Sequence, residues 1–167
     1  MTGAVGMEQY SMGKLLNKGA FGAAHMVRCK KTDKDFVVKL VDISKCSSKE
    51  RESAHKECGI LEALRHPNII EHRESFEQDG QLCIVMAFAD GGDLTGRIKA
   101  QRGKLFSEEQ VLDWFCQLSL ALKHVHDRKI LHRDLKAQNI FLSNGGSIIK
   151  LGDFGIARVL TSGWKLA

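Results

Sequence analysis

The chain has few of the features that mark linkers, disulfide frameworks, metal centres and membrane spans. Its 167 residues contain one proline and no Pro- or Ser-rich stretch, so we expect no interdomain linker. Five cysteines form no C-x-x-C pair, which argues against a disulfide framework or a zinc site. No apolar run approaches the roughly 20 residues of a membrane-spanning helix. Residues 1–9 resemble no secretory signal, so these absences predict reduced cysteines in a cytoplasmic protein.

The charge is mildly positive and is not concentrated in one stretch. The formal net charge is +5, and acidic residues are interspersed with basic ones, as in residues 47–52. Nucleic-acid binders more often show one basic stripe. We therefore expect a solvated surface that helps to attract an anionic nucleotide, with neither nucleic acid nor membrane as a partner.

The first half of the chain has strand character, interrupted by one helix. The helix is predicted to begin near Ser47, where Glu50 completes a capping box, and to end before Pro67. The predicted strands span residues 10–16, 23–29, 36–41, 69–76 and 82–88.

The second half is dominated by helices. Asp93 is placed to cap a short helix, and Ser107 with Gln110 forms the capping box of a longer one. A tight turn at residues 144–146 predicts a short hairpin. The order predicts an α+β fold of two lobes, with ligands bound where they meet. The longer helix is expected to carry one apolar stripe, made of Val111, Leu112, Phe115, Leu118, Leu122 and Val125.

Residues 132–139, His-Arg-Asp-Leu-Lys-Ala-Gln-Asn, are followed closely by Asp153-Phe154-Gly155. Phosphoryl transfer needs a carboxylate that orients the attacking hydroxyl and accepts its proton, together with oxygen ligands for magnesium. Asp134 suits the first role, and Asn139 and Asp153 suit the second. This order and spacing match the catalytic loop and metal-binding motif of protein kinases.

With these motifs the chain resembles a eukaryotic protein kinase, and more narrowly the NIMA-related (NEK) serine/threonine kinases. The similarity covers residues 10–160. The resemblance implies ATP and Mg²⁺ as cofactors and protein Ser/Thr hydroxyls as substrates. Besides the catalytic loop, it rests on the segments at residues 66–70, 84–86, 91–94, 139–142 and 150–158.

The resemblance identifies a glycine-rich loop that would bind the phosphates through backbone N–H groups. The first of the three family glycines is replaced by Asn17, whose tolerance of positive φ would preserve the turn. An ordinary hairpin is the alternative reading of this motif taken alone. The ATP-binding residues expected here are Leu16, Asn17, Lys18, Gly19, Ala20, Phe21 and Gly22.

Four further residues of the first lobe are implied to act on ATP. Lys39 corresponds to the lysine on the α- and β-phosphates, and Glu57 to the helix glutamate that steadies it. Ala24 stands where the family has valine, and Val37 stands where it has a small residue. We interpret this pair as a size exchange that preserves the volume of the adenine slot.

The remaining nucleotide contacts are expected where the two lobes join. Met86 resembles the gatekeeper, and residues 87–89 resemble the hinge, whose Ala87 and Ala89 would bind adenine through backbone groups. Asp93 is placed to meet the ribose, although capping a helix explains it equally well.

Three other residues of the catalytic loop have implied roles. Lys136 resembles the serine/threonine-kinase marker, whose ammonium neutralises charge on the transferred phosphoryl group. His132 is expected to be a packed structural residue and not a base. Arg133 resembles the arginine that binds an activation-loop phosphate.

The sequence stops within the expected activation segment, without an Ala-Pro-Glu motif. We therefore expect an N-terminal tail (1–9) followed by a partial kinase domain (10–167). Its N-lobe (10–88) would be complete, with the five-stranded sheet and an αC-type helix. Its helical C-lobe (89–167) would be incomplete. Apolar residues left uncovered, such as Phe115, predict an unstable or aggregating polypeptide.

Two alternatives to an active enzyme remain at this point: a catalytically inactive fragment that binds ATP or a partner, and a non-functional translation product. The resemblance also leaves open an association with the cytoskeleton in the cytoplasm.

Overall fold

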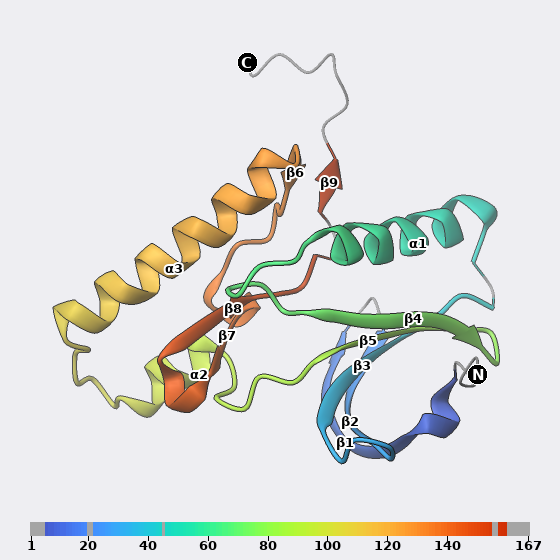
Figure 1. Ribbon diagram of the computed structural model, residues 1–167, viewed down its shortest axis with the longest axis horizontal. Coiled ribbons are helices and arrows are strands. Elements are labelled where there is room, and N and C mark those ends of the chain that lie inside the picture. Colours follow the sequence, from blue (N-terminus) through green and yellow to red (C-terminus); the bar gives the residue numbers. More distant parts are fainter. Residues whose placement is uncertain (1–5, 20–21, 45, 155–156, 160–167) are drawn as a thin grey trace. The chain divides into compact units, whose positions relative to one another are not determined.

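The structure is a computed structural model that describes residues 6–19, 22–44, 46–154 and 157–159 (Figure 1). For Glu50, Ser53, Glu57 and Arg158 the description is limited to the backbone. The chain forms two units, one of residues 1–62 and 71–88 and the other of residues 63–70 and 89–167. In the part that the structure describes, no helix is long and apolar enough to cross a membrane.

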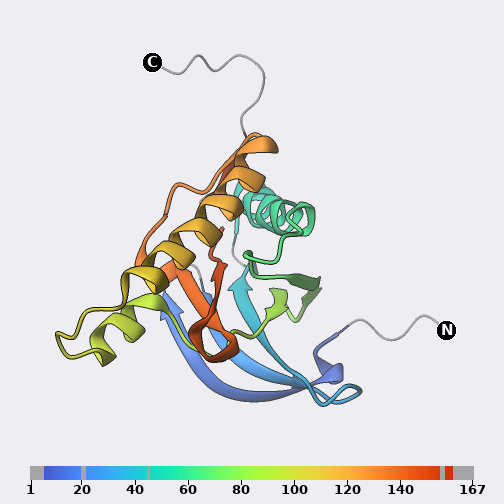
Figure 2. The same cartoon turned by 60° about the vertical axis from the view of Figure 1, so that its left-hand side comes forward.

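The first unit is a five-stranded antiparallel sheet with the strand order β1-β2-β3-β5-β4. Figure 2 shows its curvature. A 3₁₀ turn, η1, precedes the sheet, and the helix α1 lies between the third and fourth strands in sequence. The bounds are η1 Met7–Gln9, β1 Tyr10–Gly19, β2 Gly22–Cys29, β3 Asp35–Asp42, α1 Ser48–Ala63, β4 His72–Gln78 and β5 Gln81–Ala87.

One face of this sheet carries the apolar core of the first unit. Cross-strand neighbours in antiparallel sheets share a face, and the pairs Val27–Phe36, Val38–Val85 and Leu40–Cys83 all lie on it. Tyr10 and Cys29 extend the same cluster at the other end.

The second unit contains two helices, the hairpin β7-β8 and a two-stranded sheet of β6 and β9, which are far apart in the sequence. Its long helix α3 packs against β8. The core there contains Trp114, Ile140, Leu142 and Ile149, and the Trp114 indole N–H donates to Gly146 O at 2.9 Å. The bounds are α2 Leu94–Ala100, α3 Glu108–Asp127, β6 Ile130–Leu131, η2 Ala137–Asn139, β7 Ile140–Ser143, η3 Asn144–Gly146, β8 Ile148–Leu151 and β9 Arg158–Val159.

Several local predictions are confirmed. The sheet has the expected five strands. The structure adds that Asp79 and Gly80, both at positive φ, form the two-residue turn between β4 and β5. Asp93 caps α2 by accepting from Gly96 N, and Ser107 caps α3 by accepting from Gln110 N.

The strand predicted at residues 69–76 is wrong at its start, whereas the preceding helix ends before Pro67 as predicted. The strand begins at His72, because Ile69 and Ile70 pair with Leu151 of the second unit instead. The helix ends at Ala63, four residues before Pro67. The loop between them is therefore held by contacts that are remote in sequence.

The apolar stripe expected on α3 is only partly correct. Val125 is buried, whereas Phe115 has 65% of its surface exposed. Trp114 and Ala121, which the stripe omitted, are the other buried residues of this helix. At the start of α3 the buried position is therefore Trp114, one residue before the predicted Phe115.

Candidate active site

The catalytic loop, residues 132–139, connects β6 to β7 in the second unit and brings two donors onto one carboxylate. Lys136 Nζ lies 2.8 Å from Asp134 Oδ2. Asn139 Nδ2 donates to the same oxygen and to Asp134 O, both at 2.9 Å. The hydrogen bond from Lys136 is the main cause that lowers the pKa of Asp134 below its usual value. The carboxyl group is therefore ionised at neutral pH and fixed in orientation.

His132 is a buried residue of the catalytic loop and contacts the loop backbone. Its ring is 3% exposed and packs edge-on against Phe154, with ring centroids 4.6 Å apart. Nδ1 accepts from Asp134 N at 3.2 Å, and Nε2 lies 2.9 Å from Gly152 O. These partners require the tautomer with its proton on Nε2. The prediction of a packed structural residue is confirmed.

Gly152 ties the catalytic loop to the segment that carries Asp153. Its N–H donates to Asn139 O at 2.9 Å, and its carbonyl oxygen meets His132. A Cβ at this position would lie 2.8 Å from Phe141 Cε2 and 3.1 Å from Ile70 Cγ1. Gly152 is not among the residues predicted for the site, although its place directly before Asp153 is a signal in the sequence.

Arg133 and Asp153 both have positive φ, 66° and 57°. This region is unfavourable for side chains other than glycine, asparagine and aspartate, and Arg133 is the less tolerant of the two. Such conformations persist where surrounding contacts enforce them, and they concentrate at functional sites. Here the contacts of His132 and Gly152 hold the neighbouring residues.

The side chains of Asn139 and Asp153, an amide and a carboxylate, offer the oxygen ligands that magnesium prefers. Among the described residues, no three His, Cys, Asp or Glu side chains could hold a metal ion together. Magnesium is commonly bound by one or two side chains and phosphate oxygens. Asn139 Nδ2 donates to Asp134, which turns the amide oxygen, the atom that would meet a cation, away from Asp134.

In the first unit the strand register gathers four predicted ATP-binding residues on one face. Ala24 pairs with Lys39, and Val37 pairs with Met86. Val37 and Lys39 are two residues apart on β3, so both pairs lie on the face opposite the apolar core. Ala24 and Val37 are diagonal neighbours on adjacent strands, so a smaller side chain at one position can be offset by a larger one at the other. The contacts of these residues with ATP stay predictions.

The glycine-rich segment differs from the expected turn. Asn17 lies in β1, pairs with Ala24 and does not have positive φ, so the tolerance of asparagine for positive φ is not used at this position. The strand continues through Lys18 to Gly19, with irregular register between Leu15 and Asn17. Gly22 has φ 125°, and a Cβ there would collide with Leu40 O. Ala20 and Phe21 lie outside the described residues.

The remaining candidates are placed as follows. Leu16 lies in β1 and is 40% exposed. Ala87 N donates to Glu71 O at 2.9 Å, so this hinge N–H is used within the first unit. Ala89 is buried in the second unit, and Asp93 is occupied as the α2 cap. The backbone of Glu57 lies in α1, but its side chain is outside the description.

Comparison with known proteins identifies the class. A family model described as the protein kinase domain matches residues 10–166. The chain belongs to the protein kinase family, and its α+β fold is the one expected for it.

Within this family the sequence is similar to NIMA-related kinases, as predicted. It is 53% identical over 161 residues to serine/threonine-protein kinase Nek5 of Homo sapiens, covering 96% of this chain and 23% of that protein. It is 52% identical to serine/threonine-protein kinase Nek1 of Mus musculus, covering 96% of this chain and 13% of that protein. It is 43% identical to serine/threonine-protein kinase Nek3 of Mus musculus, covering 93% of this chain and 30% of that protein. The chain spans less than a third of each relative.

Proposed function

We propose that this chain transfers the γ-phosphoryl group of ATP to Ser or Thr hydroxyls of protein substrates. The observation that carries the proposal is the pair of donors, Lys136 Nζ and Asn139 Nδ2, on Asp134 Oδ2. Because both donors engage Oδ2, Oδ1 is the oxygen that would accept the proton of a substrate hydroxyl. An ionised, fixed carboxylate is what this step requires.

The other residues would position the phosphates and balance their charge. Lys136 lies beside the base, where its ammonium would stabilise negative charge on the transferred group. Lys39, steadied by Glu57, would orient the α- and β-phosphates. Asn139 and Asp153 would hold Mg²⁺, which when bound supplies positive charge across the phosphate oxygens.

The proposal is tested by transfer of radiolabel from ATP to a generic protein substrate such as casein, comparing the wild-type chain with Asp134→Asn. Loss of the base should lower the rate by about 10²–10⁴-fold. Phosphoamino acid analysis should find phosphoserine and phosphothreonine. Equal rates in both proteins would refute the assignment of Asp134.

Thermal stabilisation by MgATP separates binding from chemistry. We expect both proteins to be stabilised, since Asp134 acts on the hydroxyl and not on the nucleotide. Stabilisation without transfer by the wild-type chain would indicate a nucleotide-binding fragment. If the wild-type chain shows no stabilisation by MgATP and no phosphoryl transfer, both nucleotide binding and catalysis are excluded.

A further inference from the structure

The N-terminal half of α1 is attached to the sheet by charged groups and not by apolar packing. Of its described side chains between residues 48 and 56, only Ala54 is half-buried, and the rest are exposed. The C-terminal half differs, because Cys58, Ile60 and Leu61 are buried. What holds the first half must therefore be sought among polar contacts.

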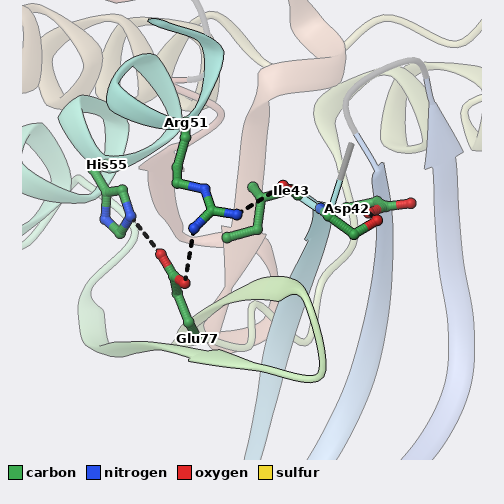
Figure 3. A network of polar contacts seen from close by, with 6 residues as sticks. Asp42, Ile43, Arg51, His55 and Glu77 are labelled. Carbon is green, nitrogen blue, oxygen red and sulfur yellow. Dashed lines mark hydrogen bonds and ion pairs between the residues drawn. The ribbon is translucent and has the colours of Figure 1, made fainter. Parts of the chain in front are cut away.

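Glu77 of β4 supplies these contacts (Figure 3). His55 Nε2 lies 2.7 Å from Glu77 Oε1, and Arg51 Nη1 lies 3.9 Å from Oε2. Arg51 and His55 are four residues apart and so lie on one face of the helix. A single carboxylate thus contacts two successive turns of α1.

Arg51 extends the attachment to the end of β3. Its Nη2 donates to Ile43 O at 3.2 Å. Ile43 is fully buried, and its N–H donates to Gly80 O in the turn after β4. The contacts of Arg51, His55 and Glu77 with one another and with Ile43 are here called the Glu77 clamp. They join α1 to β4 and to the buried residue that directly follows β3.

The strand register places Glu77 on the face of the sheet that carries Lys39. Glu77 pairs with Leu82, and Leu82 pairs with Val41, two residues beyond Lys39. Glu77 and Lys39 thus share one face. Glu57, the predicted partner of Lys39, belongs to the turn of α1 that follows His55.

We propose that Glu77 is a positioning residue, which holds the N-terminal half of α1 on the Lys39 face so that Glu57 can steady Lys39. This inference rests on the proposed function for its catalytic part. Each exposed ion pair contributes little to folding. Its loss should therefore loosen the helix locally without unfolding the protein.

The test compares Glu77→Gln with Glu52→Gln in the full chain. Glu52 is a matched control, because its 2.8 Å ion pair with Lys56 lies entirely within α1. Hydrogen exchange of the amides of residues 52–58, measured without nucleotide, should accelerate about three- to tenfold in Glu77→Gln and not in Glu52→Gln. Glu77→Asp should restore part of the protection.

A double-mutant cycle checks that Glu77 acts through Arg51. If it does, Glu77→Gln combined with Arg51→Gln should accelerate exchange less than the two single effects together predict. Full additivity, unchanged exchange in Glu77→Gln, or equal acceleration in Glu52→Gln would overturn the clamp.

The rate of phosphoryl transfer tests whether the position of α1, held by Glu77, matters for catalysis. Glu77→Gln should lower kcat about three- to tenfold and leave KM for the protein substrate unchanged, because Lys39 acts on the phosphates and not on the peptide. A normal kcat despite faster exchange would overturn the positioning role. If the wild-type chain transfers no phosphate, the proposed function and the catalytic part both fail, while exchange still decides the anchoring.

Discussion

At the scale of single residues, the candidate site depends on backbone positions as much as on side chains. Asp134 receives its two donors within the loop, directly after Arg133, whose φ is 66°. Asp153 lies at positive φ directly after Gly152, whose backbone contacts both Asn139 and His132. A side chain at Gly152 would disturb both halves of this arrangement.

We expect Gly152→Ala to destabilise the chain by about 1–3 kcal/mol, because the new methyl group meets Phe141 and Ile70 in a packed region. The measurement is the urea unfolding midpoint. Gly59→Ala is the matched control, since a Cβ there has no neighbour within 4 Å. As a helix-interior substitution it should stabilise by about 0.5–1 kcal/mol. Equal effects of the two substitutions would contradict the packing argument.

At the scale of elements, buried amides connect segments that lie far apart in the sequence. Asn68, in the loop before β4, donates from Nδ2 to Gln117 Oε1 of α3 at 2.7 Å and to Ile149 O of β8 at 3.1 Å. Gln117 Oε1 also accepts from Ile149 N, and Leu151 N donates to Asn68 O. One loop, one helix and one strand are therefore joined by two side chains.

Asn68→Ala should cost about 1–3 kcal/mol of unfolding free energy, because it removes the side-chain donor to the buried Ile149 O and one of the two donors to Gln117 Oε1. Chemical denaturation measures this loss. Gln138→Ala removes an exposed amide of η2 and should change stability by less than about 0.5 kcal/mol. A loss no greater than that of Gln138→Ala would show that water replaces the Asn68 amide.

At the scale of the whole molecule, three histidines make stability depend on pH. Burial is the main cause that lowers the pKa of His66, His72 and His124 below the ordinary value of 6.5. His66 and His124 also stack on each other, with ring centroids 5.0 Å apart, and the cations Lys150 and Arg128 act on them. All three are therefore harder to protonate in the folded chain.

We expect stability to be greatest above pH 6.5 and to fall as the pH drops through 6.5 toward the lowered values. In that window the unfolded chain binds more protons than the folded chain, which favours unfolding. The carboxyls with lowered pKa, such as Asp33 and Asp127, lose their contribution only at more acidic pH. Unfolding midpoints at pH 7.5, 6.5 and 5.5 measure the effect. A midpoint that stays constant or rises on acidification would contradict it.

The sequence by itself determined the features that depend on short-range chemistry. The sequence identified Asp134, Lys136 and Asn139 as candidates because all three lie in one loop, and the structure added that Lys136 and Asn139 both contact the Asp134 carboxylate. The caps at Asp93 and Ser107 and the turn at Asp79-Gly80 were predictable for the same reason, since each is formed by neighbouring residues.

Only the tertiary structure decided the features that depend on distant partners. Asn17 lies in a strand because it pairs with Ala24, and Ile70 leaves the predicted strand because its N–H donates to Leu151 O. The role of Glu77 was invisible in sequence, since an exposed glutamate on a strand acquires meaning only when a helix places Arg51 and His55 beside it. Backbone groups and charges are satisfied by whatever partner the fold brings near, and local sequence does not encode that choice.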